Sequence, residues 1–319
     1  MGEFDLIAHY FKRPARSAVL GVGDDCALLA PLPGHQLALS TDTLVEGRHF
    51  LPTVHPVHLG HKALAVNLSD LAACGARPRA FLLSLTLPRV DEAWLSGFAQ
   101  GLWALADAFE CELIGGDTTQ GPLNINITVM GDVPAGQALL RSGAHAGDDI
   151  YVSGTLGDAR VALEVFRGQL TVPETVFLTA RARMEQPSPR IALGMALRGV
   201  ATAAADISDG LLGDLGHILT ASQVGAEIHA AWALPLLASG PHLKLPTAQH
   251  LEFVLTGGDD YELVFTAPPQ QSAAVHEAAR ASQTPITRIG TIREGQGLDI
   301  VDAQGQAIAH PFKSFDHFA

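Results

Sequence analysis

Residues 56–74 read PVHLGHKALAVNLSDLAAC, and residues 80–87 read AFLLSLTL. The first stretch predicts a helix, because its apolar positions recur at spacings of four and three residues. The positions that share this face are Leu59, Ala63, Val66, Asp70 and Ala73. The second stretch is a short apolar run of the kind that forms a strand. A helix followed at once by a strand favours a fold that mixes both element types.

Asp70 is the one acid on that apolar helix face. An unpaired carboxylate in such a position costs several kcal/mol or takes up a proton. A bound cation would resolve this cost, and so would hydrogen bonds from neighbouring backbone donors. Taken alone, the position of Asp70 leaves both explanations open.

Strands and helices are predicted along the whole chain, so the fold class is α+β, built as two α/β domains. The predicted strands are Leu37–Ser40, Ala80–Leu87, Glu112–Ile114, Leu123–Val133, Asp149–Ser153, Ala226–His229, Tyr261–Thr266, Ile286–Ile292 and Leu298–Val301. The predicted helices are Pro56–Cys74, Asp91–Phe109, Asp158–Phe166, Glu174–Met184, Pro189–Leu197, Leu211–Ser222 and Gln270–Ser282.

The length of 319 residues predicts two domains. The segment Pro134–Asp148 contains four glycines or prolines and separates a half that ends in strands from a half rich in helices. We therefore expect an N-terminal domain over residues 1–136 and a C-terminal domain over residues 137–319.

The composition excludes several classes of partner. The net charge is −13, and no Lys/Arg-rich run occurs, so nucleic acid and anionic membrane are not expected to bind. The three cysteines are far apart and form no metal-binding or disulfide pattern. The N-terminus lacks the pattern of a signal peptide, and no apolar stretch is long enough to span a membrane. A cytoplasmic location is expected.

Acidic residues recur in one setting, directly after an apolar run and among glycines or small hydroxyl residues. The six cases are Gly23-Asp24-Asp25, Ser40-Thr41-Asp42, Asn67-Leu68-Ser69-Asp70, Gly115-Gly116-Asp117, Asp206-Ile207-Ser208-Asp209 and Gly257-Gly258-Asp259-Asp260. This pattern predicts that strands end before the acids and that the carboxylates lie on loops. Carboxylates that converge need cations, and hard oxygen ligands of this kind suit Mg²⁺ or Mn²⁺, which also hold substrate phosphates. The motifs together predict a site for several metals and a phosphate or nucleotide.

Each motif also has a plainer explanation. Gly and Asp are frequent in turns for backbone reasons alone, which covers Asp25 and Asp259. Ser208 or Asp209 could be the N-cap of the helix that follows, and a helix N-terminus also attracts phosphate. No Gly-Lys-Ser/Thr follows Gly116, so a Walker motif is excluded.

In their order along the chain, these motifs resemble the thiamine-monophosphate kinase family, which belongs to the same superfamily as aminoimidazole ribonucleotide synthetase. The matching elements cover nearly the whole chain. They are Gly2–Ile7, Gly21–Asp25, Ser40–Leu44, Lys62–Asp70, Ile114–Thr119, Arg141–Gly143, Asp206–Gly210, Gly257–Leu263 and Phe315–Phe318.

The resemblance implies transfer of the γ-phosphoryl group of ATP to thiamine monophosphate, with several Mg²⁺ ions. Because the attacking phosphate oxygen is already ionised near neutral pH, we expect direct in-line transfer with no phosphoenzyme. It implies metal contacts from Asp25, Ser40, Thr41, Asp42, Asp70, Asp117, Asp206 and Asp209, with Asp42, Asp70 and Asp117 as the catalytic acids. ATP contacts are implied for Gly116, Asp117, Arg141 and Ser208, and thiamine contacts for His49, Asp259 and Phe315. Relatives commonly have Glu at the position of Asp259 and Tyr or Trp at that of Phe315. The resemblance also implies a homodimer formed through the sheet of the N-terminal domain, and a C-terminal domain that completes the active site.

Two kinds of alternative remain. One is another enzyme of the superfamily, such as the purine-pathway synthetase, selenophosphate synthetase or the hydrogenase-maturation dehydratase. The selenium enzyme is expected to carry a reactive Cys or Sec near a Lys in a Gly-rich N-terminal segment, and the maturation factor ends in Cys, whereas this chain ends in Ala319. The other alternative is a sensor that binds nucleotide or thiamine phosphate without turnover.

Overall fold

The computed structural model describes residues 2–308. The described chain divides into two compact units. The first contains residues 2–71 and 76–136, and the second contains residues 72–75 and 137–308. Each unit has its own sheet.

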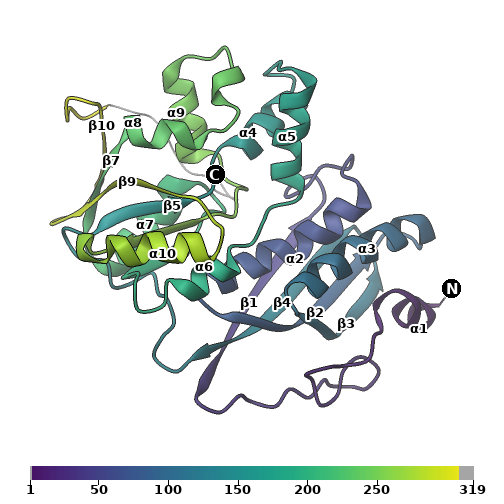
Figure 1. Ribbon diagram of the computed structural model, residues 1–319. Coiled ribbons are helices and arrows are strands. Elements are labelled where there is room, and N and C mark those ends of the chain that lie inside the picture. The colour runs from purple at the N-terminus through teal and green to yellow at the C-terminus, as the bar shows by residue number, and fades with distance from the viewer. Residues whose placement is uncertain (1, 309–319) are drawn as a thin grey trace. The chain divides into compact units, whose positions relative to one another are not determined.

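The first unit is a four-stranded mixed sheet with helices on one face (Figure 1). The strand order is β1-β4-β2-β3, with β1 antiparallel to β4, β4 antiparallel to β2, and β2 parallel to β3. The strands are β1 (His35–Val45), β2 (Arg77–Leu87), β3 (Glu112–Gln120) and β4 (Asn124–Pro134). The helices are α2 (Pro56–Ala73) and α3 (Glu92–Ala108), preceded by the short α1 (Glu3–Leu6) and a π-helical turn over Ile7–Phe11.

Helices α2 and α3 pack backbone against backbone. A Cβ added to Gly60 would overlap the carbonyl oxygen of Phe98, and one added to Gly101 would overlap that of Val57. Only glycine allows two helices to approach this closely. The two glycines therefore set the spacing of the helix pair that covers the sheet.

Helix α2 is buried around most of its circumference. The sequence pattern predicted that one face of α2 is buried and that the other, with Lys62 and Ser69, is polar. This prediction is wrong, because Lys62 and Ser69 are buried as fully as the leucines. The stretch from Ala63 to Leu68 is almost continuously apolar, which is typical of a helix enclosed on all sides. Asp70, which was expected to point inward, is half-buried.

Strands β1 and β3 continue through their acids. The prediction that strands end before Asp42 and Asp117 is wrong, because both residues lie inside strands. Asp42 pairs with Ile127 of β4, and Asp117 pairs with Ser84 of β2. Ladder pairing along the full length of β1, helped by the β-branched Thr41 and Thr43, outweighs the low strand propensity of aspartate.

The second unit is a six-stranded mixed sheet with the order β10-β7-β9-β5-β8-β6. Its strands are β5 (Asp149–Ser153), β6 (Ala203–Asp206), β7 (Gly225–His229), β8 (Leu263–Ala267), β9 (Ile286–Arg293) and β10 (Leu298–Val301). Its helices are α4 (Asp158–Phe166), α5 (Glu174–Glu185), α6 (Ile191–Ala196), α7 (Leu211–Ser222), α8 (Ala230–Ala233), α9 (Thr247–Thr256) and α10 (Ser272–Ala281), with 3₁₀ turns at Leu234–Leu236, Gly240–His242 and Pro269–Gln271.

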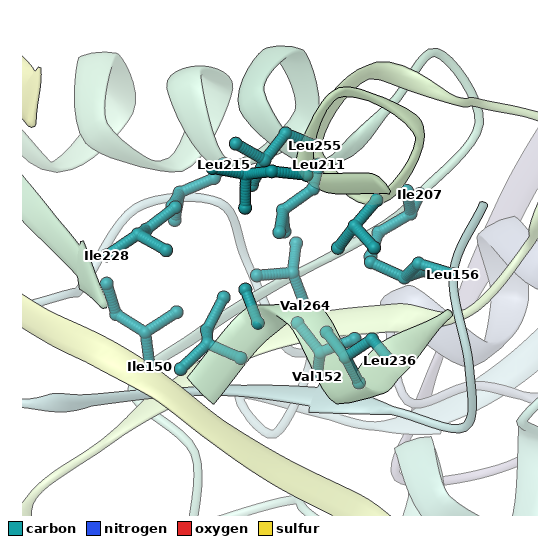
Figure 2. Packing of buried hydrophobic residues seen from close by; sticks show 14 of the residues in the cluster. Ile150, Val152, Leu156, Ile207, Leu211, Leu215, Ile228, Leu236, Leu255 and Val264 are labelled. Carbon is teal, nitrogen blue, oxygen red and sulfur yellow. The ribbon is translucent and has the colours of Figure 1, made fainter. Parts of the chain in front are cut away.

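Aliphatic side chains from strands and helices form the core of the second unit (Figure 2). Ile150 and Val152 of β5 and Val264 of β8 meet Leu211 and Leu215 of α7, and all five are fully buried. The sequence did not predict β6 or α9. Strand β6 is a run of three alanines and an aspartate, so it lacks the β-branched residues that mark a strand, and its burial on both faces makes it one.

The described helices are too short or too polar for one of them to cross a bilayer, judged over residues 2–308. Within residues 2–308, none of Cys26, Cys74 and Cys111 forms a disulfide.

Gly101→Ala is expected to destabilise the first unit by about 3 kcal/mol, because the new methyl group overlaps backbone that cannot move away like a side chain. Urea unfolding followed by the fluorescence of Trp94 and Trp103 in α3 measures the effect. Gly216→Ala in α7 is the control, since a Cβ there meets no atom within 4 Å. The control should be neutral or slightly stabilising. Equal stabilities of the two variants would contradict the close packing.

Candidate active site

In the first unit, β1 and α2 bring three of the predicted site residues together. The Ser40 hydroxyl donates a hydrogen bond of 2.5 Å to Oδ2 of Asp70. Asp42 lies two residues further along β1, so its side chain leaves the strand on the same face as Ser40. The hydroxyl and the two carboxylates form a small group of oxygen ligands at the edge strand of the sheet.

Asn67 of α2 also contacts this group, although the sequence predicted no role for it. Its Oδ1 accepts the backbone N–H of Asp42 at 3.0 Å, and its Nδ2 donates to the carbonyl of Ala63 at 3.1 Å. The Asn67 residue is 1% exposed. A polar residue inside an apolar helix was the available sequence signal, but sequence could not identify the partner.

Thr41 and Asp117 do not join the group. The Thr41 hydroxyl donates to the carbonyl of Ile127 at 3.0 Å and lies 3.1 Å from Thr128 Oγ1, on the opposite face of β1 from Ser40. Asp117 is exposed on β3, and strands β2 and β4 lie between β3 and β1. Three strand spacings separate the backbones of β3 and β1 by about 14 Å.

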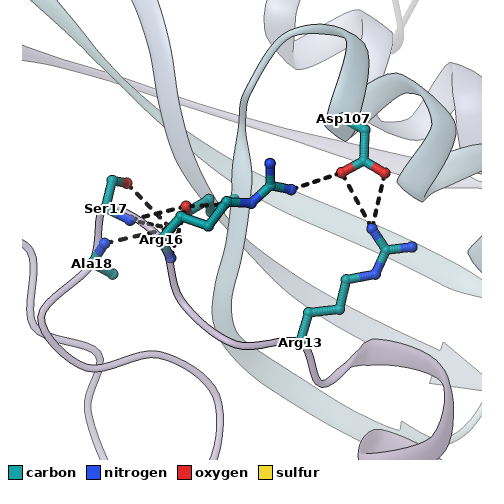
Figure 3. A network of polar contacts seen from close by, with 6 residues as sticks. Arg13, Arg16, Ser17, Ala18 and Asp107 are labelled. Atoms are coloured by element: carbon teal, nitrogen blue, oxygen red, sulfur yellow. Dashed lines mark hydrogen bonds and ion pairs between the residues drawn. The ribbon is translucent and has the colours of Figure 1, made fainter.

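Asp25 is exposed on the loop that follows the N-terminal segment, and this segment is anchored to α3 and β3 (Figure 3). The Glu112 carboxylate, only 12% exposed, accepts the N–H groups of Arg16 and Ser17 at 2.9 Å. Asp107 pairs with Arg13 at 3.0 Å and with Arg16 at 2.9 Å, but these groups are exposed and contribute little. Glu112 is therefore the main anchor of the segment that leads to Asp25.

In the second unit, backbone hydrogen bonds join the two remaining acidic motifs. Ile207 N donates to Glu262 O at 2.8 Å, Tyr261 N to Ile207 O at 2.9 Å, and Asp259 N to Ser208 O at 2.7 Å. Asp259 has a φ of +62°, a left-handed conformation that Asp tolerates better than most residues. The pairing of β6 with β8 thus continues into the loops and places Ser208 beside Asp259.

Asp214, which the sequence did not single out, binds the backbone of the loop that precedes α7. Its Oδ2 accepts the N–H groups of Ser208 at 3.0 Å and Asp209 at 3.1 Å. The alternative that Ser208 or Asp209 caps α7 is wrong, because Gly210 occupies the N-cap and makes no side-chain bond. Burial, with the charge of Asp209 as a smaller cause, raises the pKa of Asp214 to about 7.

Glu262 anchors the end of the Gly257–Glu262 loop in the interior of the second unit. Its carboxylate is completely buried and accepts hydrogen bonds from the Ser153 hydroxyl at 2.6 Å, from Arg183 at 2.8 Å and from Arg190 at 2.6 Å. Gly154, with a φ of +57°, leaves the space that the carboxylate fills. This buried ion-pair network fixes the end of the loop whose other residues include Asp259.

The sequence predicts no ligand contact for Asp260, and this residue is buried in the second unit. Its Oδ2 accepts the N–H of Gly157 at 2.9 Å, and its Oδ1 is buried with no hydrogen-bond partner among the described residues. Burial raises the pKa of Asp260 well above its usual value, against the opposing effect of the Gly157 N–H. Asp206 is also buried, at the end of β6, whereas Asp209 is half-buried.

The other predicted residues have different local settings. His49 follows β1, and its Nδ1 accepts the N–H of Val45 at 3.0 Å. Gly116 has a φ of +151°, and a Cβ there would overlap Leu83, so β2 itself requires glycine at this position. Arg141 is exposed, and its carbonyl accepts the Ser222 hydroxyl at 3.1 Å. Phe315 lies outside the described residues.

Within residues 2–308, no group of three or more His, Cys, Asp or Glu side chains is arranged to hold a metal ion. A metal ion at the oxygen atoms of Ser40 and Asp70 would therefore need further donors, such as waters or substrate phosphates. Mg²⁺ commonly binds in this way, with one or two carboxylates, waters and substrate phosphates.

Comparison with known proteins relates the entire chain to one family. Residues 23–133 match the N-terminal domain of AIR synthase related proteins, and residues 145–303 match their C-terminal domain. The thiamine-monophosphate kinase of Salmonella typhimurium is 47% identical over 325 aligned residues, which cover 100% of this chain and 98% of the relative. The chain belongs to the thiamine-monophosphate kinase family.

Solved structures of this family have the same fold. The thiamine-monophosphate kinase of Stenotrophomonas maltophilia K279a has a TM-score of 0.84 and 45% identity, with 96% of each chain covered. A structure of AaThiL complexed with AMPPCP and TMP has a TM-score of 0.76 and 31% identity, covering 91% of this chain and 89% of that one. The predicted two-domain α/β architecture and the predicted family are both confirmed.

Glu262→Gln is expected to lower the free energy of unfolding by about 3 kcal/mol, because two largely buried guanidinium groups lose their counter-charge. Urea unfolding followed by circular dichroism measures the loss. Glu277→Gln is the matched control, since Glu277 pairs with Arg280 on the surface, where an ion pair contributes at most about 1 kcal/mol. A loss no larger than that of the control would show that the network is not stabilising.

Proposed function

We propose that this chain transfers the γ-phosphoryl group of ATP to thiamine monophosphate, giving thiamine diphosphate and ADP. The observation that carries the proposal is the full-length 47% identity to a thiamine-monophosphate kinase, together with the family's acids at their expected positions. The binding of an ATP analogue and TMP by AaThiL supports the same pair of substrates. A cytoplasmic location accords with the need for ATP.

We propose Mg²⁺ as the metal. The donors are hard oxygen atoms, and Ser40, Asp42 and Asp70 stand in one group at the edge of the first sheet. Asp25, Thr41 and Asp117 would complete the set in the first unit, and Asp206 and Asp209 belong to the second unit. The separation of β3 from β1 is the reason for proposing several ions.

We assign the remaining roles from the family resemblance. Gly116, Asp117, Arg141 and Ser208 would contact ATP, and His49, Asp259 and Phe315 would contact the thiamine substrate. Nδ1 of His49 accepts the N–H of Val45, so neutral His49 carries its proton on Nε2. The backbone of Asp259 is held in a left-handed turn by the hydrogen bond from its N–H to the Ser208 carbonyl.

The chemistry needs alignment more than proton transfer. The attacking group is a phosphate oxygen that is already ionised near neutral pH, so a strong general base is unnecessary. Mg²⁺, when bound, lowers the repulsion between the two polyanions. The Ser40 hydroxyl, for example, donates a hydrogen bond that orients the Asp70 carboxylate. We therefore propose direct in-line transfer without a phosphoenzyme.

We also propose that the chain forms a homodimer through the first sheet. Leu37, Leu39 and Val45 alternate along the edge strand β1, are 47%, 61% and 38% exposed, and share the face opposite Ser40. A row of exposed apolar side chains on an edge strand is a surface that soluble proteins usually cover.

Phosphorus NMR of ATP, Mg²⁺ and thiamine monophosphate with the purified protein tests the reaction. We expect the signals of ADP and of a new diphosphate ester to grow together. Asp70→Asn should lose at least about a hundredfold in turnover, because it removes one anionic ligand, and should keep the circular dichroism spectrum of the wild type.

Three outcomes would contradict the proposal in different ways. Binding of both substrates without turnover would indicate a sensor. ATP consumption that ignores thiamine monophosphate would indicate another enzyme of the superfamily. Radioactive label left on acid-quenched protein after a pulse of γ-labelled ATP would contradict direct transfer.

Leu39→Glu is expected to convert the dimer to a monomer at micromolar concentration, because it buries a charge in the proposed interface. Light scattering measures the mass. Leu178→Glu in α5 is the control, since Leu178 is 53% exposed and belongs to the second unit, not to the first sheet. A monomeric wild type, or a dimeric Leu39→Glu variant, would contradict the proposed interface.

A further inference from the structure

Among residues 2–308, the edge strand β1 has one neighbouring strand, β4. Strand β4 bonds one edge of β1, so the amide groups that point to the other edge meet no strand of the described chain. Such an edge is free to shift unless another element bonds to it. Helix α2 supplies that element at the position of the acids.

Two hydrogen bonds join β1 to α2. The Ser40 hydroxyl donates to Asp70, and the Asp42 N–H donates to Asn67. Asn67 and Asp70 are three residues apart on the helix, so they lie on one side of it. Ser40 and Asp42 are two residues apart on the strand, so their side chains share one face. The two hydrogen bonds therefore connect neighbouring positions on one side of the helix to neighbouring positions on one face of the strand.

Asn67 is poorly suited to touching a ligand itself. It is 1% exposed, its Oδ1 is occupied by Asp42 and its Nδ2 by the Ala63 carbonyl. The bond to Ala63, four residues earlier on α2, fixes the orientation of the amide so that the oxygen faces β1. An amide in this position can accept the N–H without adding charge beside two carboxylates. Aspartate at the same position would add like charge and could not donate to Ala63.

We propose that Asn67 is a positioning residue that holds Asp42 at a fixed spacing from Asp70, so that both carboxylates are ready for a divalent cation. This inference rests on the proposed function. Residues behind metal ligands typically change metal affinity by about 10- to 100-fold when they are removed. We expect an effect of that size, transmitted through the backbone of Asp42.

The test compares wild type, Asn67→Ala and Asn67→Asp. Mn²⁺ titration followed by electron paramagnetic resonance should show an affinity at least tenfold weaker in both variants. The kcat should fall by a similar factor, with little change in KM for thiamine monophosphate. Hydrogen exchange of the β1 peptide, measured without metal, should be at least tenfold faster in Asn67→Ala, because the Asp42 N–H loses its acceptor.

Leu68→Ala is the matched control, because Leu68 is the next residue of α2, is fully buried and makes no contact that the inference uses. It should lower stability but leave Mn²⁺ affinity and β1 exchange unchanged. Unchanged Mn²⁺ affinity and exchange in folded Asn67 variants would overturn the inference while wild-type turnover keeps the proposed function. Equal loss of affinity in Leu68→Ala would also overturn it. A wild type that neither binds Mn²⁺ nor turns over would overturn the proposed function and the inference together.

Discussion

Repulsion between carboxylates is the constraint on which the arrangement of this protein depends. The chain has a net charge of −13, and its acids are concentrated in a few motifs. Three acids have specific donors: Asp70 has the Ser40 hydroxyl, Asp214 has two backbone N–H groups, and Glu262 has two arginines. Donors of this kind stabilise the charged form of a carboxylate, although burial still raises the pKa of Asp214 to about 7.

The two units hold their acidic residues in place with different contacts. In the first unit, a strand edge is joined to a buried helix by two hydrogen bonds, one of them to the amide of Asn67. In the second unit, the pairing of β6 with β8 continues into the loops, and Asp214 and Glu262 hold those loops from the interior. In both units, buried residues that are not expected to touch a ligand fix the backbone of those that are. A phosphoryl-transfer enzyme needs this kind of rigidity, because alignment supplies much of its catalysis.

Most helices and strands could be predicted from the sequence, because their apolar periodicity is strong. The exceptions have physical causes. Strand β6 consists of small residues and is a strand only because it is enclosed in the sheet. Asp42 and Asp117 were expected on loops, but ladder pairing keeps them inside strands. Asp70 was expected on an inward helix face and is half-buried, and its hydroxyl partner is 30 residues away in the sequence, so the local pattern could not identify that partner.

The sequence by itself determined the family, the two-domain α/β class and the acids that are candidates for metal and phosphate, because these depend on the order and chemistry of local motifs. Only the tertiary structure decided how those residues are held. Asn67, Asp214 and Glu262 act through partners that are close in space and, for Asn67 and Glu262, distant in the chain. Hydrogen-bond geometry and burial exist only once the sheets and helices have packed, so no local pattern could reveal them.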